Sequence, residues 1–248
     1  MNNLAVNITN LEFSYRDQPV KLFSNLNLDI VKGESFGLFG PNGAGKTTLM
    51  SIMTGLVKYT GGSVKLLGQE INIKRIAFNK QFGFVPQDFS FYHELSPTEN
   101  LEFFGAWAGL DSSTIATRVD ELLTVLGLTE VRNKQVHKFS GGMKRRVNLA
   151  ISVIHRPEIL FLDEPTVGVD VQTRFAIIDY LKKLNAEGMT LVYTSHQLHE
   201  AESLCRKIAM IDEGKIIVHD TLDNLLATHH QEGLEGLFLK LTGKSYRD

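Results

Sequence analysis

Hydrophobic and polar residues alternate with a period of two in two segments within the first 30 residues of the chain. The alternating hydrophobic positions are Leu11, Phe13 and Tyr15 in one segment and Leu26, Leu28 and Ile30 in the next. This alternation is typical of strands with one face in the core and the other in solvent. The two segments therefore predict antiparallel strands near the N-terminus.

Short, continuous apolar runs follow, and most of them alternate with helical patterns. These runs are SFGLFG at 35–40, FGFVPQ at 82–87, EILFLDE at 158–164 and TLVYTS at 190–195. Such runs are typical of strands buried on both faces. A further strand is predicted in GGSVKLLG at 61–68, and KIAMIDEGKIIVHD at 207–220 predicts a hairpin that turns at Gly214. Helices are predicted from Lys46, over 171–187, from Gln197, and twice more near the C-terminus.

The pattern is helical between residues 88 and 157. Ser96-Pro97-Thr98-Glu99 combines a capping box with a proline at the first helical position, which predicts a helix start. Apolar residues then recur at helical spacing over 119–126, and Gly127 ends that helix.

Together these elements predict an α/β fold with a mostly parallel sheet, an antiparallel β subdomain and an α-helical insertion. We expect one domain over residues 1–220. Residues 1–87 and 158–220 form its core, 88–157 form the helical subdomain, and 221–248 form a C-terminal helical tail.

Composition narrows the classes of protein that are compatible with this fold. The 248 residues carry a formal net charge of −2, which argues against nucleic acid as the main partner. The single cysteine, Cys205, excludes an intrachain disulfide and fits a reducing compartment. No apolar run approaches the roughly 20 residues that span a bilayer, and the N-terminus lacks the pattern of a signal peptide. We therefore expect a soluble chain.

The stretch GPNGAGKTT at 40–48 matches the phosphate-loop pattern, with a predicted strand before it and a helix after it. Backbone N–H groups of such a loop surround phosphate oxygens, and the helix N-terminus adds its dipole. The predicted nucleotide-binding residues here are Gly40, Pro41, Asn42, Gly43, Ala44, Gly45, Lys46, Thr47 and Thr48. Lys46 can reach the β- and γ-phosphates, and the Thr47 hydroxyl can bind Mg²⁺. The alternative is a glycine-rich turn with a chance lysine.

Two carboxylates follow the apolar run of 159–162. Asp163 is delivered to the carboxyl edge of the sheet, where ligands bind in open α/β folds, and it is the expected second anchor for Mg²⁺. Glu164 can position or deprotonate the water that attacks the γ-phosphate. The alternative for Glu164 is a solvated carboxylate at the end of a strand.

The sequence FSGGMKRRVNLA at 139–150 predicts a helix that begins with two glycines. With Ser140 as the cap, Gly141 and Gly142 leave N–H groups open to an anion. Because the chain already contains one phosphate loop, a second cradle makes sense if it serves the nucleotide of another subunit. The cations at 144–146 have an alternative interpretation, in which at least two of them form a solvated face.

The stretch SGGMKRR, placed ahead of ILFLDE, closely resembles the signature sequence of ABC-type ATPases, which have a P-loop NTPase core. The resemblance covers residues of about 1 to 220. It implies an ATPase that uses ATP and Mg²⁺, in which two cassettes dimerise head to tail and each signature faces the partner's phosphate loop. Phe139, Met143 and Val171 depart from the commoner residues of the family, but none replaces a group expected to contact phosphate.

The resemblance also assigns roles to single residues. Tyr15 matches the aromatic residue that stacks on adenine, and Asp170 matches the loop aspartate after the acidic pair. Gln87 matches the glutamine that joins the nucleotide site to the helical insertion, and it is expected at the metal and in catalysis. His196 matches the switch histidine, expected to contact the γ-phosphate. Lys46 and Glu164 complete the expected catalytic set.

These features favour the ATP-binding subunit of an ABC transporter, resembling bacterial multidrug, antibiotic and polysaccharide exporters. We expect a second ATPase subunit as partner, forming a homodimer, and separate transmembrane permease subunits that hold the chain at the inner face of the cell membrane. Aromatic residues between 89 and 107 are either core or a groove for that membrane partner. The alternatives are a family member acting on ribosomes or DNA, and an unrelated phosphate-loop kinase or GTPase.

Overall fold

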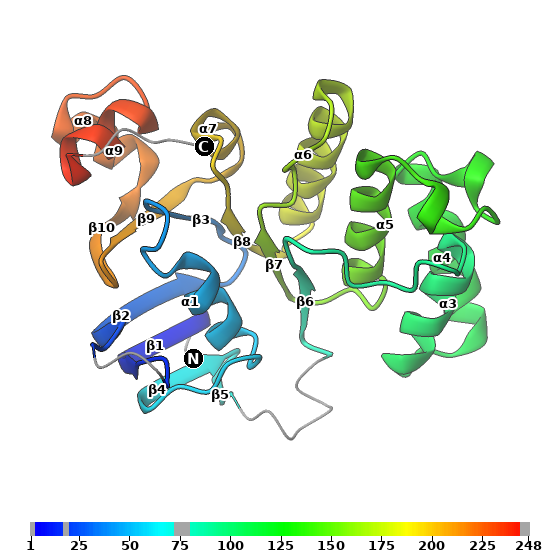
Figure 1. The fold of residues 1–248 in the computed structure, drawn as a ribbon, viewed down its shortest axis with the longest axis horizontal. Helices are drawn as coiled ribbons and strands as arrows, with labels where there is room; N and C mark the ends of the chain where they lie inside the picture. The colour runs from blue at the N-terminus through cyan, green and yellow to red at the C-terminus, as the bar shows by residue number, and fades with distance from the viewer. Residues whose placement is uncertain (1–2, 17–19, 72–79, 244–248) are drawn as a thin grey trace.

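The strands form two sheets in the computed structural model, which describes residues 3–16, 20–71 and 80–243 (Figure 1). The smaller sheet is antiparallel, and its order is β2 (Phe23–Val31), β1 (Leu4–Phe13), β4 (Gly61–Leu66) and β5 (Gln69–Glu70). The order of the larger sheet is β10 (Lys215–Thr221), β9 (Lys207–Asp212), β3 (Ser35–Phe39), β8 (Thr190–Thr194), β7 (Ile159–Asp163) and β6 (Phe82–Val85). From β9 to β6 neighbouring strands are parallel, and only β10 pairs antiparallel. The predicted fold class is confirmed.

Helices follow the strands in the predicted order. They are α1 (Lys46–Met53), α3 (Pro97–Trp107), α4 (Ser112–Val125), α5 (Gly141–Val153), α6 (Val171–Ala186), α7 (Leu198–Leu204), α8 (Leu222–His229) and α9 (Leu234–Thr242). Short 3-10 turns at Thr129–Val131 and Val136–Lys138 lead into α5. The predicted capping box is present, because Ser96 Oγ accepts from Glu99 N and Glu99 Oε2 accepts from Ser96 N.

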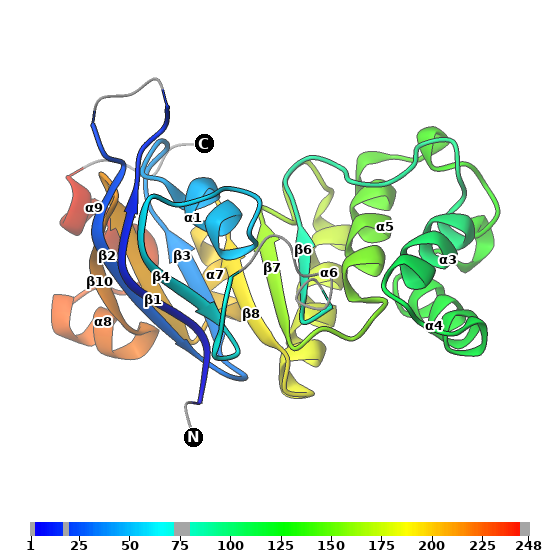
Figure 2. The ribbon, with the colours of Figure 1, turned by 90° about the horizontal axis from the view of Figure 1, so that it is seen from below.

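The larger sheet is covered on both faces, which explains its continuous apolar strands. On one face, β3, β7 and β9 pack with α1 and the antiparallel sheet in one hydrophobic core. Figure 2 shows this antiparallel sheet in front of the larger one, with α1 beside both. On the other face, residues such as Leu160 and Leu162 pack against α5, α6 and α7. The loops after the parallel strands are thereby held at one edge of a rigid sheet.

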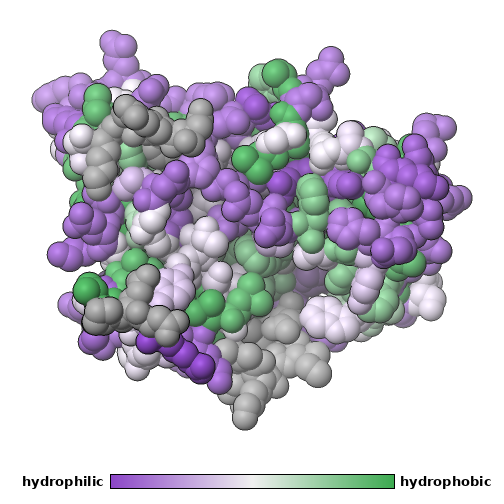
Figure 3. All heavy atoms as spheres, viewed as in Figure 1, coloured by the Kyte–Doolittle hydropathy of each residue, from purple (hydrophilic) through white to green (hydrophobic). Residues whose placement is uncertain are grey.

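The helices α3, α4 and α5 form a separate lobe beyond β6 (Figures 1 and 2), and α5 contacts β6 directly. The surface in the view of Figure 3 is largely hydrophilic, with hydrophobic side chains gathered in the middle, where the helical lobe meets the rest. Within the described residues no helix has the length and hydropathy needed to cross a bilayer.

Candidate active site

The loop of residues 40–45 joins β3 to α1 and is shaped by close backbone approaches. A Cβ at Gly40 would lie 2.0 Å from the carbonyl oxygen of Ile211, so no side chain fits there. Gly45 has φ of +106°, and its Cβ would lie 2.8 Å from the ring of Phe23. Gly45 also caps α1 without a side-chain hydrogen bond, so the first N–H groups of the helix are available to an anion.

Lys46 lies inside this loop rather than in solvent, since its side chain is only 7 % exposed. Its ammonium donates to the carbonyl oxygens of Gly40 at 2.7 Å and Pro41 at 3.1 Å. Burial lowers the pKa of Lys46, and the nearby charges of Glu164 and Asp163 act in the opposite direction. The loop therefore holds a buried cation close to the carboxylates that end β7.

Gln87, Glu164 and His196 come together at the carboxyl edge of the sheet. Glu164 Oε1 lies 2.6 Å from His196 Nε2, and Glu164 Oε2 accepts from Gln87 Nε2 at 3.2 Å. These residues follow β6, β7 and β8, which are neighbours in the sheet although Gln87 and Glu164 are 77 residues apart in sequence. The sheet order thus brings together three of the four side chains that the sequence predicted for catalysis, and the fourth is Lys46.

Asp163 is buried at the end of β7 and accepts a hydrogen bond from Thr194 Oγ1 at 2.6 Å. Thr47 is exposed at the start of α1, a helix that contacts β7. The expected metal set of Thr47, Gln87 and Asp163 offers only hydroxyl, amide and carboxylate oxygen, which suits Mg²⁺. Within the described residues there is no cluster of three or more His, Cys, Asp or Glu side chains fit for a metal. This donor set therefore fits a Mg²⁺ ion that takes its remaining ligands from phosphates and water.

Tyr15 lies beside the phosphate loop, just beyond the end of β1. Its hydroxyl is 2.6 Å from Thr48 Oγ1, and its ring packs edge-on against Phe13 at 4.9 Å between centroids. The side chain remains 44 % exposed. A partly exposed aromatic side chain therefore lies next to the start of α1.

The predicted helix start at Ser140 is confirmed. Ser140 is the N-cap of α5, and its Oγ accepts from Met143 N at 3.3 Å. Gly141 is exposed, whereas Gly142 packs closely: its Cβ would lie 3.2 Å from Thr173 Oγ1 and 3.4 Å from Asp170 Oδ2. The second glycine therefore belongs to a contact between α5 and the turn that begins α6.

Asp170 is the N-cap of α6, and its carboxylate accepts from Thr173 N at 2.9 Å and Thr173 Oγ1 at 2.7 Å. These hydrogen bonds hold the pKa of Asp170 below its usual value. The structure thus brings Asp170 together with Ser140, Gly141 and Gly142, in a region separate from the phosphate loop.

The interpretation of residues 144–146 as a mainly solvated face is wrong. Arg145 is only 4 % exposed, donates from Nη1 to Gln87 O at 2.7 Å, and lies 4.8 Å over the ring of Phe89. Arg146 donates to Leu126 O at 2.9 Å. Both cations bind backbone carbonyls that come from distant parts of the sequence, and Arg145 ties α5 to the Gln87 loop.

Sequence reasoning also missed Thr194, whose hydroxyl supports Asp163, and Glu200, which is buried in α7 behind the site. Thr194 could have been noticed, because it is the last residue of the strand that leads to His196. Glu200 gave no such signal, since an acidic residue in the first turn of a helix is usually a solvated one.

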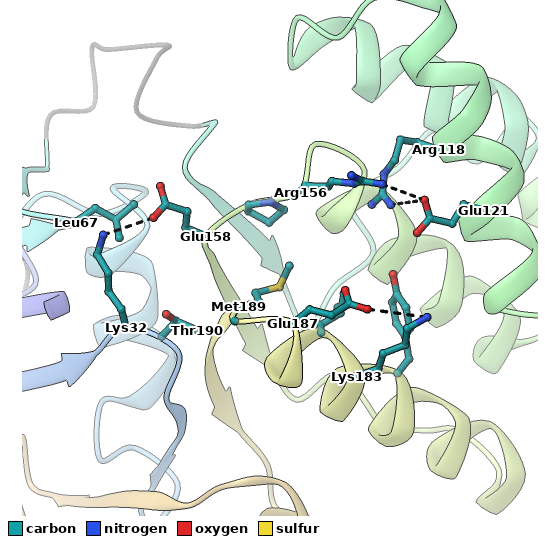
Figure 4. A pocket seen from close by; sticks show the side chains of 14 residues that line it. Lys32, Leu67, Arg118, Glu121, Arg156, Glu158, Lys183, Glu187, Met189 and Thr190 are labelled. Atoms are coloured by element: carbon teal, nitrogen blue, oxygen red, sulfur yellow. Dashed lines mark hydrogen bonds and ion pairs between the residues drawn. The ribbon is translucent and has the colours of Figure 1, made fainter. Parts of the chain in front are cut away.

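A cavity of about 480 Å³ lies at the opposite edge of the sheet, near the first residues of β7 and β8 (Figure 4). Its charged side chains pair with one another: Lys32 with Glu158, Arg118 and Arg156 with Glu121, and Lys183 with Glu187. All its cations are thus engaged by carboxylates, and the cavity is a poor candidate for phosphate.

Comparisons with known proteins agree with this geometry. A family model described as ABC transporter matches residues 23–167. The chain is 42 % identical over 204 residues to a linearmycin resistance ATP-binding protein of Bacillus subtilis (strain 168), covering 82 % of this chain and 66 % of the relative. It is 36 % identical over 227 residues to a daunorubicin resistance ATP-binding protein of Streptomyces coeruleorubidus, covering 92 % and 71 %. The chain thus spans about two thirds of the length of the curated relatives that it matches.

Solved structures show the same fold. An ATP-binding subunit of an ABC transporter superimposes with a TM-score of 0.88 at 25 % identity, covering 96 % of this chain and 99 % of the other. An ATP-binding cassette solved as a dimer in a post-hydrolysis state with ADP and Pi gives 0.80 at 28 % identity, covering 88 % and 98 %. The phosphate loop, the assembled acidic edge and these similarities together show that the chain belongs to the ATP-binding cassette proteins of the ABC transporter family.

Proposed function

We propose that this chain hydrolyses Mg-ATP in a head-to-tail dimer and drives the export of a substrate through separate membrane subunits. The observation that carries the proposal is the cluster of Gln87, Glu164 and His196 at the edge of the sheet where Lys46 lies in its loop. We also propose the division predicted above, with a cassette over residues 1–220 and a helical tail beyond it.

ATP would be held by the backbone N–H groups of the loop 40–48, by the Lys46 ammonium and by the exposed ring of Tyr15. The loop and the helix start supply donors to the phosphates. Stacking of a base on Tyr15 would contribute about 1–3 kcal/mol. Thr47, Gln87 and Asp163 would hold the Mg²⁺, which when bound offsets the negative charge of the phosphates.

Glu164 is the group that acts on water in this proposal. Its carboxylate is held from both sides, by Gln87 and by His196, and is therefore oriented rather than free to rotate. A carboxylate in this position can accept a proton from a water aligned with the γ-phosphate. His196 orients Glu164 from the neighbouring strand end.

The helix start at Ser140 supports a head-to-tail dimer. In Figures 1 and 2, α5 is separated from α1 by β7 and β6, so this chain cannot bring its own signature onto its own phosphate loop without breaking the sheet. An anion held by Ser140, Gly141 and Gly142 would therefore belong to a second cassette. We propose an identical chain as that partner, with Asp170 near the contact between the two.

A groove where the helical lobe meets the sheet supports a membrane partner. It encloses about 280 Å³ and is lined by Leu56, Phe84, Phe104, Trp107 and other residues. Trp107 is 63 % exposed and Leu56 is 66 % exposed, and exposed large apolar side chains that gather at one groove are typical of an interface. Of the two interpretations of the aromatic residues, we propose the partner groove for the exposed Trp107, whereas Phe91 is buried and packs in the core.

Export is proposed from the relatives, which include the two resistance proteins and a Nod factor export ATP-binding protein of Cupriavidus pinatubonensis that is 41 % identical over 205 residues. The permease would hold the chain at the inner, cytoplasmic face of the membrane. The net charge of −2 supports a partner other than nucleic acid and disfavours the alternative on ribosomes or DNA.

The test is Glu164→Gln, which keeps the shape of the site and removes the carboxylate. Turnover of Mg-ATP should fall by about 10²–10⁴-fold, the usual effect of losing a positioned base. The affinity for a fluorescent ATP analogue should stay near wild type. In the presence of ATP, a dimer of the variant should accumulate and be visible by size-exclusion chromatography. Near-normal turnover in this variant would refute the proposal, and purification from detergent-solubilised membranes tests the permease separately.

A further inference from the structure

We propose that Glu200 is a positioning residue for the hydrolysis of ATP. Its carboxylate ties the segments that carry Glu164, Asp170 and His196 into one unit. The inference rests on the proposed function, because it assigns a role only if Glu164 and His196 act on ATP. Glu200 lies in the first turn of α7 and is 4 % exposed. It is thus a buried acid outside the set of residues expected to touch nucleotide.

The carboxylate of Glu200 contacts side chains from three separate segments. Glu200 Oε2 accepts from Thr166 Oγ1 at 2.6 Å and from Tyr193 OH at 2.8 Å. Glu200 Oε1 lies 3.0 Å from Arg174 Nε. Oε2 is therefore hydrogen-bonded, whereas Oε1 makes an ion pair without a hydrogen bond. The guanidinium balances the negative charge, as a buried charge requires.

Each contact is close in sequence to a candidate site residue. Thr166 is two residues after Glu164, Tyr193 is three residues before His196, and Arg174 is four residues after Asp170. Glu200 itself is four residues after His196, in the first turn of the helix that follows it. A single carboxylate thus fixes the strand end, the loop and the helix start that carry the three site residues.

The backbone of Glu164 explains why such a support is needed. Glu164 has φ of +51°, which lies in the left-handed region. This conformation costs free energy in any residue other than glycine. A strained conformation persists only where the surrounding structure holds it. The Glu164 N–H donates to Thr194, and the loop beyond it is anchored by Thr166 on Glu200. Loss of the anchor would let the loop relax and move the Glu164 carboxylate away from His196.

Glutamine cannot replace Glu200 without losing part of this network. A carboxylate accepts on both oxygens, whereas an amide has one accepting oxygen and one donating NH₂. If the amide oxygen serves Thr166 and Tyr193, its NH₂ faces the Arg174 guanidinium, which then lacks a counter-charge. Glu200→Gln therefore disturbs the positioning while keeping the volume of the side chain.

Tyr193→Phe is a milder change, and the chain offers a matched control for it. Tyr193 and Tyr180 are both buried tyrosines, but the Tyr180 hydroxyl makes no hydrogen bond within the part of the chain that the structure describes. Tyr180 lies on α6 and lines the cavity of Figure 4, at the opposite edge of the sheet from Glu164. Tyr180→Phe thus removes a buried hydroxyl that has no role in the network.

The experiment measures kcat, KM and equilibrium binding of a fluorescent ATP analogue for the full chain and its variants. Glu200→Gln should lower kcat by about 10²-fold, the usual effect of a misplacement of about 1 Å at a reacting centre, with KM and binding close to wild type. Tyr193→Phe should lower kcat by a smaller factor, and Tyr180→Phe should leave it unchanged. In the presence of ATP, the Glu200→Gln variant should form the same stable dimer as Glu164→Gln, because it still binds ATP but hydrolyses it slowly.

A purely structural role would give a different pattern. Unchanged kcat in Glu200→Gln, or an equal loss in Tyr193→Phe and Tyr180→Phe, would overturn the inference. A loss of kcat that is matched by a loss of ATP binding in both Glu200→Gln and Tyr193→Phe would also overturn it. The parallel Glu164→Gln measurement separates the two proposals: if Glu164→Gln abolishes turnover and Glu200→Gln leaves kcat unchanged, only the positioning role fails. If Glu164→Gln retains turnover, the proposed function itself fails.

Discussion

Gly141→Asp should separate the binding of ATP from its hydrolysis. A Cβ at Gly141 would meet only Gly168 O, at 3.5 Å, which is an ordinary contact, so the chain itself can accept a side chain there. An aspartate in the first turn of α5 also interacts favourably with the helix dipole, by about 0.3–1 kcal/mol. The variant should therefore fold at least as well as wild type. Gly142→Asp is a poorer test, because its carboxylate would lie beside Asp170 of the same chain.

The expected loss in dimer closure can be worked out from the backbone N–H donors at the start of α5. The first N–H groups of a helix have no partner within it, and of these Met143 N is engaged by Ser140 Oγ. Gly141 and Gly142 leave two donors for a phosphate, each worth about 1.5–3 kcal/mol as a hydrogen bond to a charged group. A carboxylate that excludes the phosphate from both should cost about 3–6 kcal/mol, or roughly 10²–10⁴-fold in dimer closure. Direct repulsion between the two negative charges, about 4 kcal/mol at 4 Å and an effective dielectric constant of 20, adds to this.

The experiment measures ATP turnover, ATP binding by the monomer, and dimer formation in the presence of ATP. Gly141→Asp should lose turnover and dimer while binding ATP with near wild-type affinity through its own loop at 40–48. Gly141→Asn is the control of equal bulk without the charge, and it should lose less. A mixture of Gly141→Asp with Lys46→Ala can combine both defects in one composite site and leave the other intact, so part of the activity should return. Loss of ATP binding by a folded Gly141→Asp monomer would refute the head-to-tail reasoning.

Two further predictions concern affinity and stability. Tyr15→Ala should weaken ATP binding by about 1–3 kcal/mol through lost stacking, whereas Tyr15→Trp should bind nearly as well as wild type; equally poor binding in both variants would assign Tyr15 to packing alone. Burial lowers the pKa of His155, whose Nε2 lies 3.1 Å from Phe82 O. The unfolded chain therefore takes up this proton first, starting at about pH 6.5, and stability should decrease as the pH falls from there through the folded pKa. Thermal unfolding at several pH values should show this decrease, and His155→Gln should reduce it; an unchanged pH dependence would contradict the assignment.

The elements that could be predicted from the sequence are those whose signals are local. The helix that begins at Ser96 is specified by a capping box within four residues, and the hairpin at Gly214 by its turn. The strand of Asp163 is specified by an apolar run that only a sheet covered on both faces explains. The predicted extent of the first strand is wrong at Tyr15, because the period-two alternation continues to this residue but β1 ends at Phe13.

Contacts between distant segments could not be predicted in the same way. Arg145 lies in a run of three cations, and nothing local distinguishes it from its neighbours. Its partner Gln87 O is 58 residues away, and its burial follows from the packing of α5 against β6. Glu200 is similar, because its partners Thr166 and Tyr193 meet it only after β7 and β8 have paired. Side-chain identity sets what such a residue can bind, and the fold decides whether it does.

Arg145 also connects the two kinds of site that one chain carries. Its guanidinium holds the backbone of Gln87, whose side chain donates to Glu164, and it lies five residues after Ser140 on α5. In the proposed head-to-tail dimer, Glu164 would act on the nucleotide bound by its own chain, whereas Ser140 would hold the nucleotide bound by the partner. A displacement of the Gln87 loop at one nucleotide would therefore be transmitted by Arg145 to the helix that contacts the other. Since Arg145 is buried and lies over the ring of Phe89, we expect the helical lobe and the Gln87 loop to move as one body.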